Sequence, residues 1–152
     1  MTWRSWDDIE IGQTIRSQEV TVTETHLVNW ASLTGDWFEL HMSEEYARST
    51  IFNQRVVHGP LTFGLSIGLA YQTGYVNKDW VIAWLGANDM KLPKPVFIGD
   101  TVHLDLSVVS KRETSNPDRG IAVLKYDIKN QNDDTVLEFE STFMARRASG
   151  GP

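Results

Sequence analysis

The sequence predicts an α+β protein in which an antiparallel β-sheet wraps around one long, buried central helix. Residues 60–73 form an apolar stretch with almost no polar face, so a helix made of them must be buried on most sides. Residues 102–145 instead alternate apolar and polar side chains, as antiparallel strands with one buried face do. The simplest packing of these two parts places the sheet around the helix.

The first half of the chain combines a short strand with helices. Residues 18–23 alternate β-branched and polar side chains, which indicates a short strand. Thr21 and Glu24 have the spacing of a capping box and predict the start of a helix. The next apolar-face positions recur at helical intervals: Leu27, Trp30, Ala31 and Thr34. Gly35 is expected to end this helix, and Ser43 to begin another short one.

The central helix and the strands that follow it are marked by turn residues. Pro60 fits the first helical position, where its missing N–H would be unpaired anyway, and Gly74 is suited to a C-terminal cap. Turn-rich segments at residues 115–118 and 130–134 separate the later strands. We expect strands at residues 80–85, 102–108, 122–128 and 137–145. They form an antiparallel meander.

Length and composition narrow the class of protein. A chain of 152 residues suits a single domain, here residues 1–147, followed by a flexible C-terminal tail at 148–152. The absence of cysteine excludes disulfides and thiolate chemistry, and fits an expected cytoplasmic location. The acidic first ten residues do not resemble a signal peptide, and no apolar stretch is long enough to span a membrane. A net charge of −6 argues against nucleic acid as a partner.

Asp36 and His41 are the strongest candidates for acid–base chemistry. On a continuous helix, five residues turn the chain through about 500°, so the two side chains would point apart. Gly35 indicates that the helix has already ended, and an irregular turn can bring both side chains to one point. The bulky neighbours Trp37 and Phe38 can exclude water and shift pKa values towards neutrality. The same spacing also fits an aspartate that caps a turn and a histidine that is half-buried and satisfied.

Gly59 and the remaining histidines are further candidates. Gly59 leaves a backbone N–H open at the positive end of the central helix, where it can stabilise negative charge on a carbonyl oxygen. It also fits an ordinary glycine N-cap. His58 either lines a pocket or anchors the chain before the helix. His26 is expected on the exposed side of the first helix, and His103 at a surface position of a strand.

Three segments of the chain form a specific set. The first reads Thr34-Gly35-Asp36-Trp37-Phe38-Glu39-Leu40-His41, followed after five residues by Ala47. The second reads Arg55-Val56-Val57-His58-Gly59-Pro60-Leu61, and the third Leu92-Pro93-Lys94-Pro95-Val96-Phe97-Ile98-Gly99-Asp100. Together and in this order they resemble the MaoC-like dehydratases, the (R)-specific enoyl-CoA hydratases of the hotdog superfamily. That family's motif is a small residue, Gly-Asp, any residue, Asn-Pro, an aliphatic residue, His, five residues, then Ala or Ser.

The resemblance implies a hotdog fold, a homodimer or higher oligomer, and acyl thioesters of coenzyme A or acyl carrier protein as substrates. It implies that Asp36 and His41 are the catalytic pair, which adds or removes water across the C2–C3 bond of an enoyl thioester. It also implies that the Gly59 N–H faces the thioester carbonyl. No metal and no cofactor is implied beyond the coenzyme A or carrier protein of the substrate itself. We expect the acyl tunnel at or near the dimer interface.

One departure from the family matters for the site. The Asn-Pro of the motif is replaced by Phe38-Glu39, and that Asn normally helps to fix the turn around the catalytic pair. The turn must therefore be held in another way. We expect a pocket reshaped for a different acyl group, with Trp37, Phe38, Glu39 and His58 as its candidate lining residues. The alternative is a poorly held pair with low activity.

Two other functions are compatible with the same fold. A hotdog acyl-CoA thioesterase usually takes its carboxylate from the central helix or its near neighbours, and residues 60–73 contain neither Asp nor Glu. A non-catalytic acyl-thioester-binding subunit would be favoured by loss of Asp36 or His41, and this chain has both. The sequence therefore favours the hydratase/dehydratase.

Overall fold

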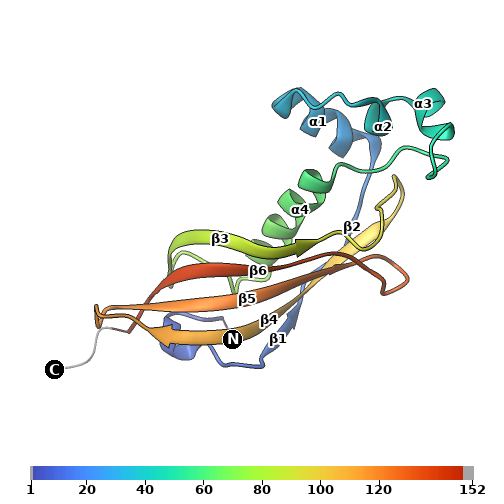
Figure 1. Cartoon of the computed structure of the whole chain (residues 1–152). Helices are drawn as coiled ribbons and strands as arrows, with labels where there is room; N and C mark the ends of the chain where they lie inside the picture. The colour runs from blue at the N-terminus through green and yellow to red at the C-terminus, as the bar shows by residue number, and fades with distance from the viewer. Residues whose placement is uncertain (1, 149–152) are drawn as a thin grey trace.

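The computed structural model describes residues 2–148 and contains an antiparallel sheet with helices on one side (Figure 1). Three long strands, β4, β5 and β6, form the predicted meander, while β3 pairs with β6 at one edge and β1 and β2 pair with β4 at the other. The strands are β1 (Thr14–Arg16), β2 (Val20–Thr21), β3 (Val81–Lys91), β4 (Thr101–Glu113), β5 (Arg119–Lys129) and β6 (Thr135–Arg146). The predicted α+β architecture is confirmed.

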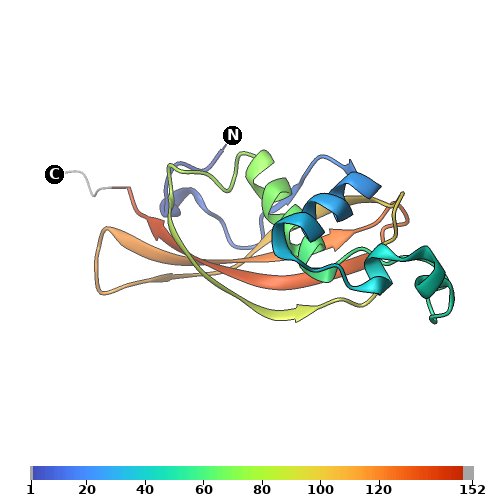
Figure 2. The same ribbon diagram turned by 90° about the horizontal axis from the view of Figure 1, so that it is seen from above.

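The helices lie between β2 and β3 in the chain, apart from a short 3₁₀ helix near the N-terminus, η1 (Trp6–Asp8). They are α1 (Glu24–Thr34), α2 (Glu39–Met42), α3 (Glu44–Arg48) and the central helix α4 (Gly59–Gln72). Seen from above, α4 crosses over the sheet, and α2 and α3 extend past one end of it (Figure 2). Among the described residues, no helix combines the length and the hydropathy needed to cross a bilayer.

The ends of α1 are set by local backbone chemistry. The predicted capping box at Thr21 is wrong. The N-cap lies two residues later, at Thr23, and the His26 ring accepts the Thr23 N–H at 3.0 Å. The delay arises because the backbone of Val22 still bonds to Gly99 and Asp100, the residues just before β4. Because its ring bonds to the N-cap residue, His26 is half-buried, and the exposed position predicted for it is wrong. Gly35 ends the helix as predicted, with a left-handed φ of 80°.

The core lies between α4 and the inner face of the sheet. Leu106, Tyr126 and Phe139 stand opposite one another on β4, β5 and β6, and the Tyr126 and Phe139 rings stack with centroids 4.7 Å apart. α4 is less buried than the sequence predicted, because Ile67 and Tyr71 are exposed in the single chain. They lie on the side of the helix that the sheet does not cover. The helix therefore presents one apolar side to a partner or to solvent.

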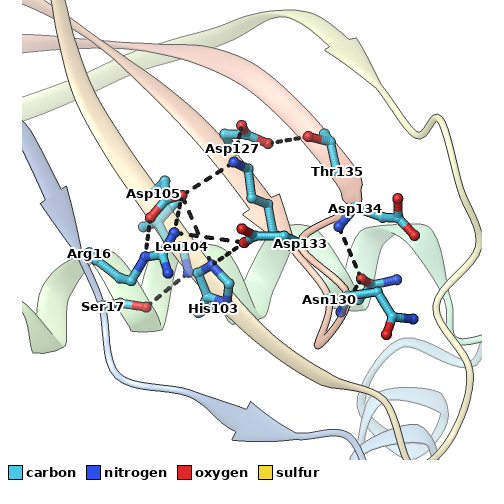
Figure 3. Close-up of polar contacts among 12 residues, drawn as sticks. Arg16, Ser17, His103, Leu104, Asp105, Asp127, Asn130, Asp133, Asp134 and Thr135 are labelled. Carbon is cyan, nitrogen blue, oxygen red and sulfur yellow. Dashed lines mark hydrogen bonds and ion pairs between the residues drawn. The ribbon is translucent and has the colours of Figure 1, made fainter.

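The surface position predicted for His103 is wrong, since its side chain is almost fully buried. His103 points to the outer face of β4, where the β1–β2 segment and the turn of residues 130–134 cover it (Figure 3). Its Nε2 lies 3.6 Å from an oxygen of Asp133, and the neighbouring Asp105 pairs with Arg16 at 2.7 Å. Alternation along a strand shows which face a residue takes, and here a polar network covers the outer face.

The predicted flexible tail falls almost entirely outside the described residues. Ala148 alone is described, and its backbone N–H donates to the carboxylate of Asp7 at 2.8 Å. The strand predicted at residues 80–85 begins at Val81 and continues to Lys91, six residues beyond the predicted end.

Candidate active site

Asp36, His41 and His58 meet at the N-terminal end of α4. One side-chain ligand atom from each lies within 4.8 Å of the other two. Asp36 lies in the turn between α1 and α2, His41 lies on α2, and His58 immediately precedes α4. Three separate segments of the chain thus bring two imidazoles and a carboxylate close together.

The turn that carries Asp36 is built from local hydrogen bonds. The Thr34 hydroxyl accepts the Asp36 N–H at 3.2 Å, and the Asp36 carboxylate accepts the Phe38 N–H at 3.4 Å. α2 then starts at Glu39, with Phe38 as an N-cap that offers no side-chain hydrogen bond. These bonds turn the chain sharply after Gly35, so that Asp36 and His41 are not splayed as they would be on one continuous helix.

His41 is held by a backbone carbonyl from another segment. Its Nδ1 lies 2.6 Å from the Val56 oxygen, and the Val56 N–H in turn donates to the Leu40 oxygen at 3.2 Å. A carbonyl oxygen can only accept, so Nδ1 must carry the proton. In the neutral ring, Nε2 is therefore the nitrogen with the free lone pair. This tautomer leaves Nε2 able to take a proton from a bound molecule.

His58 lies behind this pair and is fully buried. Its Nε2 donates to the backbone oxygen of Asp36 at 3.0 Å, and its ring stacks on His41 with centroids 4.0 Å apart and a tilt of 31°. Burial lowers the pKa of His58 below the ordinary 6.5, and the bond to Asp36 opposes that shift without cancelling it. Its Nδ1 has no hydrogen-bond partner among residues 2–148.

The three groups are poorly arranged for a shared metal ion. A carboxylate and two imidazoles could in principle bind zinc. The His41 and His58 rings are packed against each other, with centroids 4.0 Å apart and a tilt of 31°. The Nδ1 of His41 and the Nε2 of His58 are also engaged by carbonyl oxygens. The geometry suits proton transfer better than metal binding.

A cavity of about 380 Å³ opens beside His41. It is lined by Gly59 and Thr62 at the start of α4 and by residues 92–96. The remaining lining residues are Phe52, Val56, Val57 and Val136. The cavity is mostly apolar, with the imidazole of His41 at its edge, which is an arrangement suited to an apolar ligand with one reactive polar end.

Gly59 occupies the first position of α4, where a backbone N–H has no acceptor within the helix. A Cβ at this position would lie 2.8 Å from Cδ2 of Leu92, on the opposite wall. The absence of a side chain therefore lets Leu92 pack directly against the backbone of Gly59, beside the free N–H.

The four predicted pocket residues divide into two groups. His58 contacts the pair from behind, whereas Trp37, Phe38 and Glu39 are exposed and do not line this cavity within the single chain.

Sequence reasoning missed the Val56 carbonyl and the Leu92 side chain. A backbone carbonyl leaves no signal in residue type, so Val56 could not have been found. Leu92 begins the segment of residues 92–100 that resembles the family, and its apolar side chain could have marked it as a pocket residue.

Several known proteins are similar to this chain in sequence and in fold. Residues 8–128 match the family model described as MaoC like domain. The protein MaoC of Klebsiella aerogenes is 35% identical over 109 residues, which is 72% of this chain but only 31% of that protein. An (R)-specific enoyl-CoA hydratase of Rhodospirillum rubrum is 32% identical over 68% of each chain. A solved structure from Archaeoglobus, described as a monoamine oxidase regulatory protein, is 34% identical, covers 95% of each chain and has a TM-score of 0.89.

Proposed function

Because the chain belongs to the family of MaoC-like dehydratases, we propose that it adds water to, or removes it from, the C2–C3 bond of an enoyl thioester. The sheet wrapped on α4 is the hotdog fold that the sequence predicted. The observation that carries the proposal is the meeting of the Asp36 carboxylate with the imidazole of His41, which itself lines an apolar cavity. Hydration of a conjugated thioester needs both an acid–base pair and an apolar site for the acyl group.

The pair supplies the proton transfers. During hydration, a water molecule held between the Asp36 carboxylate and Nε2 of His41 gives up a proton as its oxygen bonds to C3. The electron pair of the double bond moves through C2 onto the thioester oxygen. A proton returned from the pair to C2 then completes the product, so atoms and charge balance. Dehydration is the same sequence in reverse.

Gly59 supports the charge that develops on the thioester. Gly59 is the first residue of α4, at the positive end of the helix, and lines the same cavity as His41. A carbonyl oxygen bound there gains negative charge as C3 is attacked, and a fixed N–H stabilises that charge without having to reorganise. Coenzyme A or acyl carrier protein carries the acyl group, and no other cofactor takes part.

We also propose that two copies of the chain associate through the open side of α4. Ile67 and Tyr71 of α4 and Trp84 of the edge strand β3 are all exposed, and they surround a second, almost wholly apolar cavity of about 240 Å³. Exposed apolar surface beside an unpaired strand edge favours association. Trp37 and Phe38 are exposed in the single chain, and a second copy is the partner that could cover them.

The test is hydration of crotonyl-CoA, followed as loss of the conjugated-thioester absorbance. Asp36→Asn and His41→Ala should each lower kcat by about 10²–10⁴-fold while remaining folded, because each removes one member of the acid–base pair. Asp118→Asn is the matched control. Asp118 lies in the β4–β5 turn, at the opposite end of the sheet from α2 and α3 (Figure 1), and its replacement should leave kcat unchanged.

A wild-type protein that hydrates neither crotonyl-CoA nor longer, branched and dicarboxylic enoyl thioesters would contradict the proposal. Release of free thiol from saturated acyl-CoA would instead favour the thioesterase, although α4 carries no Asp or Glu to activate water. Tight binding of acyl-CoA without turnover would favour the binding subunit.

A further inference from the structure

The turn that carries the proposed catalytic pair depends on a few local hydrogen bonds and has no buried side chain of α2 to anchor it. α2 has only four residues, none of them buried, and its N-cap residue Phe38 makes no side-chain cap. A helix this short is not stable by itself in water. The bond from the Phe38 N–H to the Asp36 carboxylate is long, at 3.4 Å. An outside contact must therefore fix the position of Asp36 relative to His41.

His58 makes that contact on both members of the pair. Its Nε2 bonds to the backbone oxygen of Asp36 at 3.0 Å, and its ring covers one face of His41 at 4.0 Å. His58 is itself well anchored. It is fully buried, its carbonyl accepts the N–H of Thr62 in the first turn of α4, and the preceding Val57 bonds to Val96. A rigid element thus reaches across 22 residues of sequence to the weakly supported turn.

The arrangement requires a neutral His58. Nε2 must carry the proton because the Asp36 oxygen can only accept. A charged ring would also bury an Nδ1–H without an acceptor among residues 2–148, and would face His41 at 4.0 Å. The Asp36 carboxylate is the other titratable group that faces it. Burial lowers the pKa of His58, which agrees with the neutral form.

We propose that His58 is a positioning residue whose imidazole, bonded to the Asp36 carbonyl and stacked on His41, fixes the geometry of the catalytic pair. It touches no reacting atom in this scheme and acts through Asp36 and His41. The kinetic consequences rest on the proposed function, whereas the tautomer of His58 does not.

Replacing His58 by glutamine or by asparagine distinguishes a positioning role from simple packing, because both side chains carry an amide but only one can reach the Asp36 carbonyl. The amide nitrogen of glutamine lies as many bonds from Cβ as Nε2 of histidine, so His58→Gln keeps a donor for the Asp36 carbonyl. The amide nitrogen of asparagine corresponds to Nδ1, so His58→Asn is polar but cannot make the bond. We expect His58→Asn to lower kcat for crotonyl-CoA about 10–100-fold with little change in KM, since small misplacement of catalytic groups has effects of this size. His58→Gln should retain kcat within about 5-fold of wild type.

Equal kcat for wild type and His58→Asn would overturn the proposal, and so would an equal loss in both variants at equal folded fraction. Nitrogen NMR of the wild-type histidines gives a readout that does not need activity. It should show His58 protonated at Nε2, bare at Nδ1, and still neutral at the pH where an ordinary histidine is half charged. A Nδ1–H or charged His58 would reject the inference, even if the protein hydrates no enoyl thioester. Should wild type be inactive while His58 shows the expected tautomer, the proposed function fails and the contact with Asp36 stands.

Discussion

Replacing Gly59 by alanine adds one methyl group beside the N–H proposed to bind the thioester oxygen. The new Cβ would lie 2.8 Å from Cδ2 of Leu92, inside van der Waals contact. Leu92 is 52% exposed, so its side chain can move aside at a cost of about 0.5–1.5 kcal/mol. Because Gly59 is the first residue of α4, the interior propensity gain of alanine, about 1 kcal/mol, is an upper limit on what offsets this cost. The free energy of unfolding should therefore change by about 1 kcal/mol or less.

The effect on activity should be much larger. Leu92 and Gly59 line the same cavity, so either the methyl group or the displaced leucine takes up space beside the N–H. Displacing the thioester oxygen by about 1 Å would lower kcat/KM by up to about 100-fold. We expect a loss of about 10–100-fold, with a Tm within about 4 °C of wild type.

The assay is kcat/KM for crotonyl-CoA, together with a thermal unfolding curve. Gly64→Ala is the matched control. Its Cβ would lie 3.6 Å from Trp30, an ordinary contact, and Gly64 does not line the cavity beside His41. Wild-type kcat/KM in Gly59→Ala would refute the role given to the N–H. A Tm fall of more than about 8 °C would refute the claim that Leu92 yields.

Three further predictions concern stability. Gly120→Ala would place a Cβ 2.6 Å from the buried ring of Trp6, and such overpacking should cost about 1–3 kcal/mol and lower Tm by about 2–12 °C in a thermal melt. Arg55→Met removes a largely buried guanidinium that pairs with the half-exposed carboxylates of Glu24 and Glu44. Urea unfolding should show a free energy of unfolding lower by about 1–2 kcal/mol. An unchanged free energy of unfolding would mean that solvent fully screens both pairs. His58 has a folded-state pKa below 6.5, so at lower pH the unfolded chain binds the proton and the folded chain does not. Stability should therefore fall as pH drops below about 6.5, and urea unfolding should show a steeper fall in wild type than in His58→Gln.

Local patterns in the sequence predicted most of the fold. Gly35 marked the end of α1, and the alternating residues of β4, β5 and β6 placed three strands in the right order. These signals are reliable because they depend on backbone conformation and on the period of side chains along one element. The errors arose where neighbouring elements decided the outcome. His103 alternates to the outer face, as the pattern indicated, but the covering turn at residues 130–134 could not be inferred from β4 itself.

The sequence alone singled out Asp36 and His41 as candidates for acid–base chemistry, at a spacing that brings the two side chains together only if the helix has ended before Asp36. Only the tertiary structure decided how that pair is held. The Val56 carbonyl sets the tautomer of His41, and buried His58 reaches back to Asp36. Both contacts join segments at least 15 residues apart, and each uses a backbone oxygen, which every residue type carries. Residue identity reports local conformation and chemical capacity, whereas the partners of a backbone carbonyl are fixed by packing of the whole chain.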